Sequence, residues 1–420
     1  MRGPVYSQRS DEIFSPETLA SPHALFSRLR RERPLSRVGE TGVHLVASWD
    51  LIQQVLARPS DFSANLSGVL IRGEDGTPAR FEFPDLGGSN VIATADDPEH
   101  AVHRALTQPR LASKRIASLE EALHAWSAEA LIPWLEAGGG DFVPIAERVP
   151  ARAIALLLGL PDGDVSRHRR WAMMGGDMLA GAVSRGAMAS LAHETGAMSR
   201  YLGEALAAAK SAPDPGPDAP LLHALARGVL HGQISDAEAV GIAVVMFGAG
   251  GESTAALLAS CVHRLASDTK LADTLRSEPA LIPRFVEEIV RLEPPFKFHY
   301  RRVRRPCRLA GFDLAADDRL MLLWASANRD ATVFDEPDAL RLDRRYPNHH
   351  MGFGRGTHFC IGAPVARLEA RVVVGELLRR TREICLDPDC PPRWAPSIFV
   401  RRLEALEILA GTELGNQETK

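Results

Sequence analysis

The chain has 420 residues, of which 45% are hydrophobic, and its formal net charge is −4. A chain of this size can bury a large core and a sizeable cofactor, and a charge so close to balance gives no indication of a nucleic-acid partner. Its five cysteines are too few and too scattered for a disulfide framework, which indicates a reducing compartment.

The sequence carries no sign of export or of membrane insertion. Residues 1–6 lack the apolar core of a signal peptide, and no run provides the roughly 20 apolar residues that span a bilayer. The longest apolar run, 239–251, leads directly into Glu252. We therefore expect a cytoplasmic protein with no membrane partner.

Helical periodicity dominates the chain. Apolar residues recur at helical spacing near 22–33, 48–57, 97–110, 114–136, 144–158, 163–180, 187–210, 236–266, 268–276, 281–292 and 363–380. Strand-like pieces lie near 43–47, 307–314, 319–323 and 397–409, and irregular stretches cover 58–96, 211–219 and 329–359. The pattern predicts a mainly α fold with small β-sheets. We expect one domain spanning 1–420, because the candidate functional residues on both sides of the proline-rich 211–218 segment have to converge. We expect its β-rich portion mostly within 40–75 and 295–325.

The helical segment near 97–110 places two basic side chains on one face. His100 and Arg104 are four residues apart, so they project from the same side of a helix. Taken singly, such residues are more often solvated surface groups. His103 has no assigned role and is expected on the surface.

The central segment reads as one long helix with glycines in its middle. Ser235 and Glu238 form the capping-box pattern at its start. Gly248, Gly250 and Gly251 each cost about 1 kcal/mol relative to alanine in a helix interior. A helix that tolerates this loss needs either close packing against a neighbouring backbone or a local opening of its turns, and the sequence leaves both explanations open.

One cysteine follows a glycine-rich loop and precedes a helical pattern. Gly354, Gly356 and Gly362 allow main chain to approach a flat ligand, and a sulfur at a helix N-terminus is favoured as the anion. A thiolate at Cys360 could therefore ligate a haem iron. The alternative is a buried structural cysteine, while zinc is disfavoured because no second Cys or His pair has suitable spacing.

The run Phe353-Gly354-x-Gly356-x-His358-x-Cys360-x-Gly362 resembles the haem-binding signature of the cytochrome P-450 haem-thiolate monooxygenases. Segments 45–62, 247–254, 287–301 and 327–344 look like other parts of the same family, in the same order. The resemblance spans nearly the whole chain. It implies the cytochrome P-450 fold of the soluble bacterial type and a haem b (iron protoporphyrin IX) whose iron is bound by Cys360.

The resemblance also implies how the haem is held. The family binds the haem propionates with a His-x-x-x-Arg pair and two further donors, because a buried carboxylate needs cationic partners. The matching cofactor-binding residues in this sequence are His100, Arg104, Arg301, Phe353, His358, Cys360 and Gly362.

The glycine-containing middle of the long helix resembles the family's oxygen-binding motif. By this resemblance Ala249 and Gly250 would lie above the iron, and Glu252 and Ser253 would be the catalytic acid–alcohol pair. The family usually has threonine where this chain has Ser253. Serine keeps the hydroxyl donor but its rotamer is less restricted, so we expect oxygen activation with some leakage to peroxide.

An acid and a base three residues apart recur in the family's Glu-x-x-Arg region. Glu288 and Arg291 share one helix face, and such a pair taken alone is common. The resemblance implies that Glu288, Arg291 and Arg344 form a buried ionic cluster. Burying such a cluster helps only if every member is paired, so losing one should cost folding and haem retention.

Family positions further imply an apolar pocket for a hydrophobic small molecule such as a terpenoid, steroid, fatty acid or polyketide, in secondary metabolism. The 62–90 stretch would be a mobile lid over this pocket. The expected pocket residues are Val69, Leu70, Ala249, Phe296, Phe298, Ile398 and Phe399.

The implied reaction is monooxygenation that uses dioxygen and two electrons. No flavin or iron–sulfur pattern is present, so the electrons would come from a ferredoxin or flavodoxin with its NAD(P)H-dependent reductase, docked on a monomer. Candidate docking residues are Arg104, Arg110, Lys114, Arg115 and Arg355. The alternatives are a peroxide-driven peroxygenase of the same fold, a catalytically silent haem protein that binds a ligand or recruits an enzyme, and a structural protein without haem.

Overall fold

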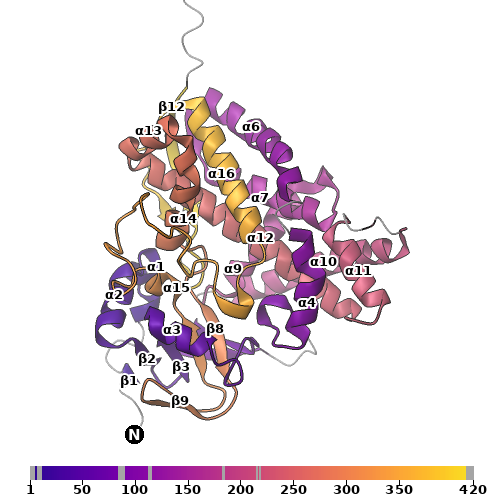
Figure 1. Cartoon of the computed structure of the whole chain (residues 1–420), viewed down its shortest axis with the longest axis vertical. Coiled ribbons are helices and arrows are strands. Elements are labelled where there is room, and N and C mark those ends of the chain that lie inside the picture. The colour runs from indigo at the N-terminus through magenta and orange to yellow at the C-terminus, as the bar shows by residue number, and fades with distance from the viewer. Residues whose placement is uncertain are drawn as a thin grey trace, which may run out of the picture.

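Helices make up most of the chain, as the sequence predicts. The computed structural model describes residues 5–6, 12–83, 90–111, 116–181, 185–213, 216 and 219–412. The helices in the order of the chain (Figure 1) are α1 (Pro16–Ala20), α2 (His23–Glu32), α3 (Trp49–Leu56), α4 (Glu99–Thr107), α6 (Glu120–Glu136), α7 (Val143–Leu158), α8 (Val165–Ala172), α9 (Met174–Met178), α10 (Arg185–Ser211), α11 (Leu221–Leu230), α12 (Asp236–Ala266), α13 (Thr269–Ser277), α14 (Ile282–Leu292), α15 (Trp324–Ala327) and α16 (Ala363–Arg380).

The strands form one large sheet and several small ones. The large sheet has the order β1-β2-β3-β11-β8-β4, a three-stranded sheet has the order β12-β15-β7, and the other strands pair as β5/β6, β9/β10 and β13/β14. Their bounds are β1 (Val5–Tyr6), β2 (Leu35–Val38), β3 (Val43–Val46), β4 (Phe62–Ser63), β5 (Gly68–Arg72), β6 (Pro78–Glu82), β7 (Gly139–Asp141), β8 (His299–Val303), β9 (Cys307–Leu309), β10 (Phe312–Leu314), β11 (Arg319–Leu322), β12 (Thr381–Leu386), β13 (Arg393–Trp394), β14 (Leu403–Ala405) and β15 (Glu407–Thr412).

The large sheet fixes β8 inside the molecule. β8 runs antiparallel to β11, with Tyr300 opposite Met321, and β11 runs parallel to β3. Figure 1 places these strands at the end of the molecule where the chain begins, with the helical part beyond them. Because β8 pairs with a strand on each side, the positions of its side chains are fixed.

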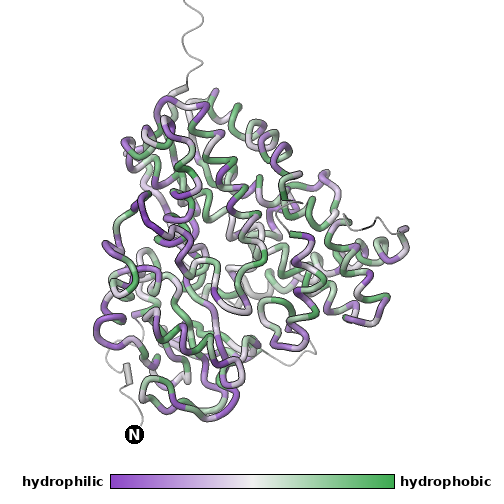
Figure 2. The backbone as a smooth tube through the Cα atoms, in the orientation of Figure 1, coloured by the Kyte–Doolittle hydropathy of each residue, from purple (hydrophilic) through white to green (hydrophobic). Residues whose placement is uncertain are grey.

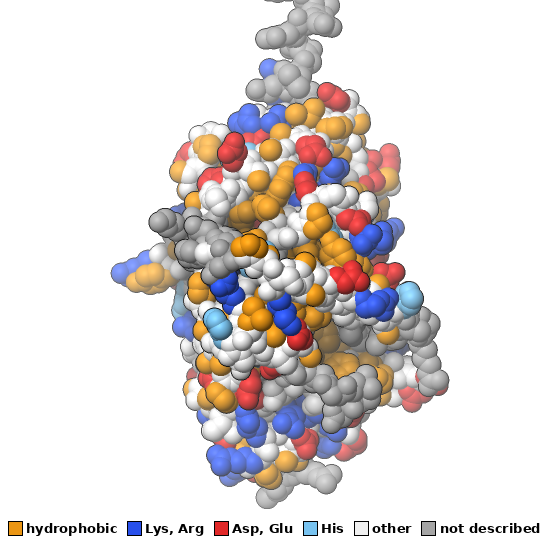
Figure 3. Space-filling model, turned by 90° about the vertical axis from the view of Figure 1, so that its right-hand side faces the viewer, with side chains coloured by type: hydrophobic (Ala, Val, Ile, Leu, Met, Phe, Trp, Pro, Cys, Tyr) orange, Lys and Arg blue, Asp and Glu red, His pale blue; other side chains and the backbone are white. Residues whose placement is uncertain are grey.

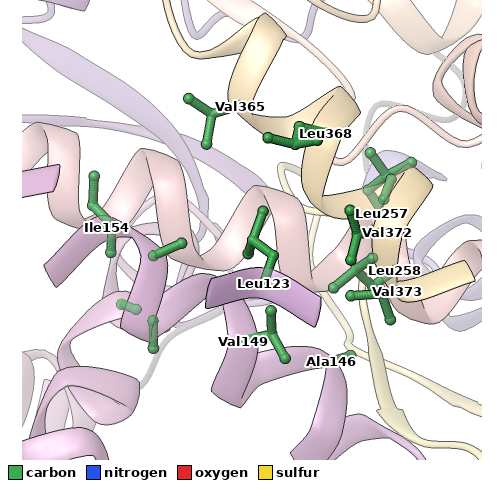
Figure 4. Packing of buried hydrophobic residues seen from close by; sticks show 14 of the residues in the cluster. Leu123, Ala146, Val149, Ile154, Leu257, Leu258, Val365, Leu368, Val372 and Val373 are labelled. Atoms are coloured by element: carbon green, nitrogen blue, oxygen red, sulfur yellow. The ribbon is translucent and has the colours of Figure 1, made fainter. Parts of the chain in front are cut away.

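The main hydrophobic core lies between α6, α7, α12 and α16. Figure 4 shows Leu123, Val149, Leu257 and Val372 from these four helices pointing toward one another. The hydropathy of the outer helices alternates along the backbone (Figure 2), as expected when one face of each helix packs inward. On the side that carries α10 and α11, hydrophobic and charged side chains are interspersed (Figure 3).

Helix α12 crosses this core. Ser235 caps it with the predicted capping box, since the Ser235 side chain accepts from the Glu238 N–H and the Glu238 side chain accepts from the Ser235 N–H. Among the described residues, α12 alone is long and apolar enough to span a membrane. Its most apolar window is 67% buried inside the molecule, which is the environment of a core helix in a globular protein.

Several regions differ from the sequence-based assignment. The stretch 58–96 is not wholly irregular, because β5 and β6 form a hairpin in which Val69 pairs with Phe81. Residues 84–89 of the expected lid lie outside the described part of the chain. Helix α11 and strand β12 are additional elements, and the single strand expected at 397–409 is replaced by β14 and β15.

His103 is buried, not on the surface as expected. Its side chain is 1% exposed, and its Nδ1 accepts a hydrogen bond from the Ile92 N–H at 3.2 Å. Its Nε2 lies 3.7 Å from Glu238 at the start of α12. His103 therefore connects α4 to the capping box of the central helix.

Candidate active site

A single large cavity contains most of the residues that the sequence singles out. It encloses about 1450 Å³ of empty space, part of it open to solvent. Helices α4, α7, α12 and α16, strand β8 and the 352–362 loop supply its walls. The apolar part of the wall includes Ile92, Leu111, Ile154, Leu157, Val245, Met246, Leu257, Val290, Pro295 and Phe296.

Cys360 faces this cavity from a loop that is tied to itself. The Cys360 N–H donates to the Phe353 carbonyl at 2.9 Å, and the Gly354 N–H donates to the Met351 carbonyl at 2.9 Å. Gly354 and Gly356 have φ angles of 69° and 72°, in the left-handed region that favours glycine. The loop therefore needs glycine at both positions to present the cysteine.

The start of α16 provides the electrostatic environment of the sulfur. Burial raises the pKa of the Cys360 thiol, and the backbone N–H groups of Gly362 and Ala363, which donate toward the sulfur, act in the opposite direction. Pro364 lies in the first turn of α16, a position where proline needs no hydrogen-bond donor. A cation bound at the sulfur would add to the effect of these N–H groups and favour the thiolate.

Basic side chains line one part of the cavity. The rings of His100 and His358 are 4.1 Å apart between centroids, and Arg104 donates to the Phe359 carbonyl at 2.9 Å. Arg301 is 8% exposed, and its Nη1 donates to the Tyr300 carbonyl at 2.7 Å. All of these basic residues line the same cavity, so the structure brings the four predicted donors together.

Within the described part of the chain, Arg104, Arg301 and His358 have no carboxylate partner, and His100 has only the exposed Asp97, 3.4 Å from its Nδ1. Burial lowers the pKa of Arg301 to about 10, and no described carboxylate forms an ion pair with it. The Nδ1 atom of His358 is buried without a hydrogen-bond partner. Buried cations and orphaned donors are unfavourable unless a ligand pairs with them. A ligand with carboxylates fits this wall.

Helix α12 presents small side chains to the cavity. Ala249, Gly250 and Ser253 line it, and the Ser253 hydroxyl donates to the Ala249 carbonyl at 2.5 Å. Thr254, which is 3% exposed, also borders the cavity. A serine hydroxyl both donates and accepts, so Ser253 can exchange its partner for a ligand atom.

Gly251 of α12 serves close packing. The helix is continuous from Asp236 to Ala266, without a local opening. A Cβ atom at Gly251 would overlap the Cβ of Ala172 on α8. Of the two explanations left open by the sequence, the structure supports close approach of neighbouring helices.

Glu252 points away from the cavity and is buried against α9. It is 1% exposed, its Oε2 accepts from the Gly176 N–H at 2.6 Å, and its Oε1 lies 3.6 Å from Nε of Arg402. Burial raises the pKa of Glu252 to about 8, although Arg402 acts to lower it. Arg402 also pairs with Asp177 at 2.7 Å. Glu252 therefore holds its proton to a higher pH than an exposed glutamate does.

The Glu288, Arg291 and Arg344 side chains are in contact. Arg291 binds both oxygens of Glu288 at 2.7 and 2.9 Å, and Nε of Arg344 donates to Glu288 Oε1 at 3.0 Å. The side chains of Glu288 and Arg291 are completely buried. The remaining N–H groups of Arg291 donate to the carbonyls of Asn328, Pro337 and Ala339. Each polar group of the Glu288–Arg291 pair thus has a partner.

Of the predicted pocket residues, Ala249 and Phe296 line the cavity. The other five belong to a neighbouring hydrophobic cluster and are at most 5% exposed: Val69, Leu70, Phe298, Ile398 and Phe399. They support the cavity from behind and do not form its wall. These residues were predicted from their positions in the family pattern. Which side chains of each segment reach the cavity depends on tertiary packing, which that pattern does not give.

Three polar residues of the cavity wall were not predicted from the sequence. They are His299, which precedes Arg301 by two residues on β8, Trp324 at the start of α15, and Glu369 on α16. Burial raises the pKa of Glu369 to about 8, and its Oε2 has no hydrogen-bond partner. Of the three, only His299 could have been found from the sequence. It lies two residues before the predicted donor Arg301, and residues two apart in a strand share a face.

Comparison with known proteins assigns the chain to a family. The cytochrome P450 family model matches residues 196–398. "Cytochrome P450 144" of Mycobacterium tuberculosis is 38% identical over 95% of this chain and 91% of its own length. The chain belongs to the cytochrome P450 family. "Putative cytochrome P450 126" of the same species is 33% identical over 86% of this chain and 87% of its own length.

Solved P450 structures share the fold. CYP108D1 from Novosphingobium aromaticivorans has a TM-score of 0.82 and 26% identity, covering 97% of this chain and 100% of its own. CYP109E1 from Bacillus megaterium, in complex with testosterone, has a TM-score of 0.81 and 27% identity, covering 94% and 99%. The predicted family, fold and enzyme class are confirmed. This P450 is a monooxygenase whose cofactor is haem b, held in this family by a cysteine thiolate.

Proposed function

We propose that Cys360 ligates the haem iron and that the chain oxygenates an apolar small molecule in the cavity between this loop and α12. One observation carries the proposal: a single cavity joins Cys360, the basic wall and Ser253. The bound haem supplies dioxygen activation and transfer of one oxygen atom to the substrate. The protein supplies binding, orientation, exclusion of water and movement of protons.

The residues around the cofactor divide this work. The N–H groups of Gly362 and Ala363 stabilise negative charge on the Cys360 sulfur. Arg301 and His358, with the α4 pair His100 and Arg104, would hold the haem carboxylates, because all four line the cavity and only His100 has a carboxylate partner, Asp97, among the described residues. The apolar wall excludes water from the substrate.

Two residues of α12 would handle protons. Ser253 holds a proton on its Oγ at the cavity wall. Glu252 precedes it in sequence, and burial raises its pKa to about 8, so it can resupply the hydroxyl with a proton through water. Retention of both groups favours a dioxygen-dependent enzyme over a peroxygenase. Comparing turnover driven by peroxide with turnover driven by a ferredoxin and NAD(P)H separates the two.

The ligand role of Cys360 is tested by spectroscopy. We expect the reduced protein with carbon monoxide to show the thiolate type of spectrum, and Cys360→Ser to abolish it. Cys385→Ser is the matched control, since Cys385 lies on β12 and does not line the cavity. A thiolate-type spectrum that persists in Cys360→Ser would overturn the assignment.

The substrate class that we propose is a terpenoid, steroid, fatty acid or polyketide. The mainly apolar wall supports an apolar ligand. A relative named "Steroid C26-monooxygenase" in Mycolicibacterium smegmatis is 29% identical over 78% of this chain and 80% of its own length. A library of such compounds should contain ligands that shift the ferric haem to high spin. A ligand that shifts the spin state without electron-dependent product would instead indicate a silent haem protein.

The electron donor that we propose is a small acidic ferredoxin or flavodoxin, acting with its reductase on a cytoplasmic monomer. Of the five basic residues suggested for docking, Arg104 and Arg355 line the cavity, which leaves Arg110 among the described residues. Lys114 and Arg115 lie outside the described part of the chain. Reconstitution with purified donors, compared by the rate of electron transfer, tests this partner.

A further inference from the structure

His299 occupies a defined place beside the basic wall. It lies on β8 two residues before Arg301, and both side chains line the cavity. The residue between them, Tyr300, points the other way, and its hydroxyl accepts from the buried Leu70 N–H at 2.9 Å. The alternation of side chains along a strand thus places His299 and Arg301 on the same face.

The protonation of the His299 ring is fixed by Trp324. The indole Nε1 of Trp324 donates to His299 Nδ1 at 2.8 Å. Because an indole nitrogen can only donate, Nδ1 must be the accepting nitrogen of the imidazole. The ring proton therefore resides on Nε2, and His299 carries one N–H donor in a known position.

This N–H donor has no protein acceptor within the described residues. The ring is packed between Phe296 and Phe399, with centroids 5.7 and 5.6 Å away, and neither offers an acceptor. Burial lowers the pKa of His299 to about 4, and the nearby Arg301 acts in the same direction. The imidazole is thus a neutral donor at pH 7, aligned with a cation that also lacks an anion.

We propose that the Nε2 N–H of His299 donates to a haem carboxylate together with Arg301, and that Trp324 is a positioning residue that fixes the required tautomer. The inference rests on the proposed haem site and adds two residues to it. A carboxylate has the lone pairs to accept from both groups at once. A hydroxyl or carbonyl of the substrate is the competing acceptor, which the experiment distinguishes.

The test uses four variants of the full-length holoenzyme. His299→Gln keeps a donor near the Nε2 position, His299→Phe removes it while keeping a ring, and Trp324→Phe removes the indole N–H. Phe399→Leu is the packing control, because it changes the ring contact with His299 and keeps the donor. The readouts are the rate of haem transfer to apomyoglobin and the ferric/ferrous midpoint potential.

We expect His299→Phe to lose haem about tenfold faster than the wild type, the factor that corresponds to roughly 1.4 kcal/mol for one charge-assisted bond. Its midpoint potential should become more negative, because an unpaired carboxylate stabilises ferric iron. Trp324→Phe should show a smaller change in the same direction. His299→Gln and Phe399→Leu should remain close to the wild type.

Two results would overturn the inference. Unchanged haem loss and potential in His299→Phe, with weakened substrate binding, would assign His299 to the substrate. Equal changes in His299→Phe and Phe399→Leu would show that packing alone matters. The carbon monoxide spectrum is recorded for each variant, so a failure of thiolate ligation is detected separately. If His299→Phe does not fold, the other two variants still test the inference. It requires Trp324→Phe to lose haem faster than the wild type and His299→Gln to lose haem at about the wild-type rate.

Discussion

Nε2 of His350 donates to Oε2 of Glu287 at 3.0 Å, and this contact links both sides of the cysteine loop. The His350 Nδ1 accepts from the Gly352 N–H at 3.1 Å, which places the ring proton on Nε2. The same Glu287 carboxylate binds Arg367 on α16 at 2.5 and 2.9 Å. One acid on α14 therefore holds the segment before Cys360 and the helix after it.

Glu287→Gln should release this connection. We expect faster conversion of the reduced carbon monoxide complex from the thiolate type to the neutral-thiol type, with a loss of about 2 kcal/mol in unfolding free energy. Burial acts to raise the pKa of Glu287, but the bonds from His350 and Arg367 prevail and lower it to about 2. Its stabilising contribution is therefore present above pH 4.5 and lost as the pH falls toward 2. An identical acid-unfolding profile in Glu287→Gln would contradict this reading.

Glu288→Gln should destabilise the protein by about 3–5 kcal/mol, because it leaves the buried Arg291 guanidinium without its counter-charge. Urea unfolding and haem content measure the effect. The control is Glu404→Gln, which breaks the exposed pair between Arg393 and Glu404 and should cost less than about 1 kcal/mol. Similar losses in both variants would show that the cluster has no special structural role.

Ser253→Ala should uncouple electron use from product formation. The hydroxyl at the cavity wall is lost, so we expect more peroxide and a several-fold lower yield of product per NAD(P)H consumed. Ser253→Thr keeps the hydroxyl and should preserve or improve coupling. Thr254→Val is the matched control, since Thr254 also borders the cavity. If Thr254→Val uncouples and Ser253→Ala does not, the roles of the two neighbours are reversed.

Two glycines of α12 should respond in opposite ways to alanine. A Cβ at Gly251 would overlap Ala172, so Gly251→Ala should cost about 1–3 kcal/mol through overpacking. The nearest atom to a Cβ at Gly248 is a Gly175 Cα at 3.8 Å, which is ordinary contact. Gly248→Ala should therefore stabilise the helix by about 0.5–1 kcal/mol. Thermal unfolding of the two variants measures the difference.

Glu252 should make the protein less stable as the pH rises. Its pKa is about 8 in the folded chain and near 4.5 ordinarily, so the folded state binds more protons between these values. Stability then falls with rising pH in this window, by up to about 1.4 kcal/mol per pH unit. Glu252→Gln should flatten the slope, and Glu369→Gln should act in the same direction because its pKa is also about 8. Unchanged slopes in both variants would exclude this linkage.

Local patterns were sufficient to predict most helices and the cysteine loop. The capping box at Ser235 and the proline after Cys360 mark helix starts that the structure reproduces. The glycines around Cys360 were informative because two of them occupy left-handed backbone that other residues avoid. These signals come from residues that are neighbours in the sequence, so they can be recognised without knowledge of tertiary contacts.

Contacts between distant segments were not predictable in the same way. His103 is buried because the Ile92 N–H and Glu238 converge on its ring from separate elements. Val69 lies in a hairpin whose partner strand follows the turn around Gly76, within a stretch rich in glycine and charge that reads as a loop. Helix α11 follows the proline-rich 213–220 segment, whose composition indicates a loop and obscures the helix start.

The bond from Arg104 to the Phe359 carbonyl joins α4 to the residue beside Cys360 using protein atoms alone. The cysteine loop also closes on itself through the Cys360 N–H and the Phe353 carbonyl. The position of the cysteine loop relative to α4 is thus set by contacts within the polypeptide. Removing the Arg104 guanidinium would therefore loosen the cysteine loop and also remove a donor from the basic wall, and both changes would lower the haem content.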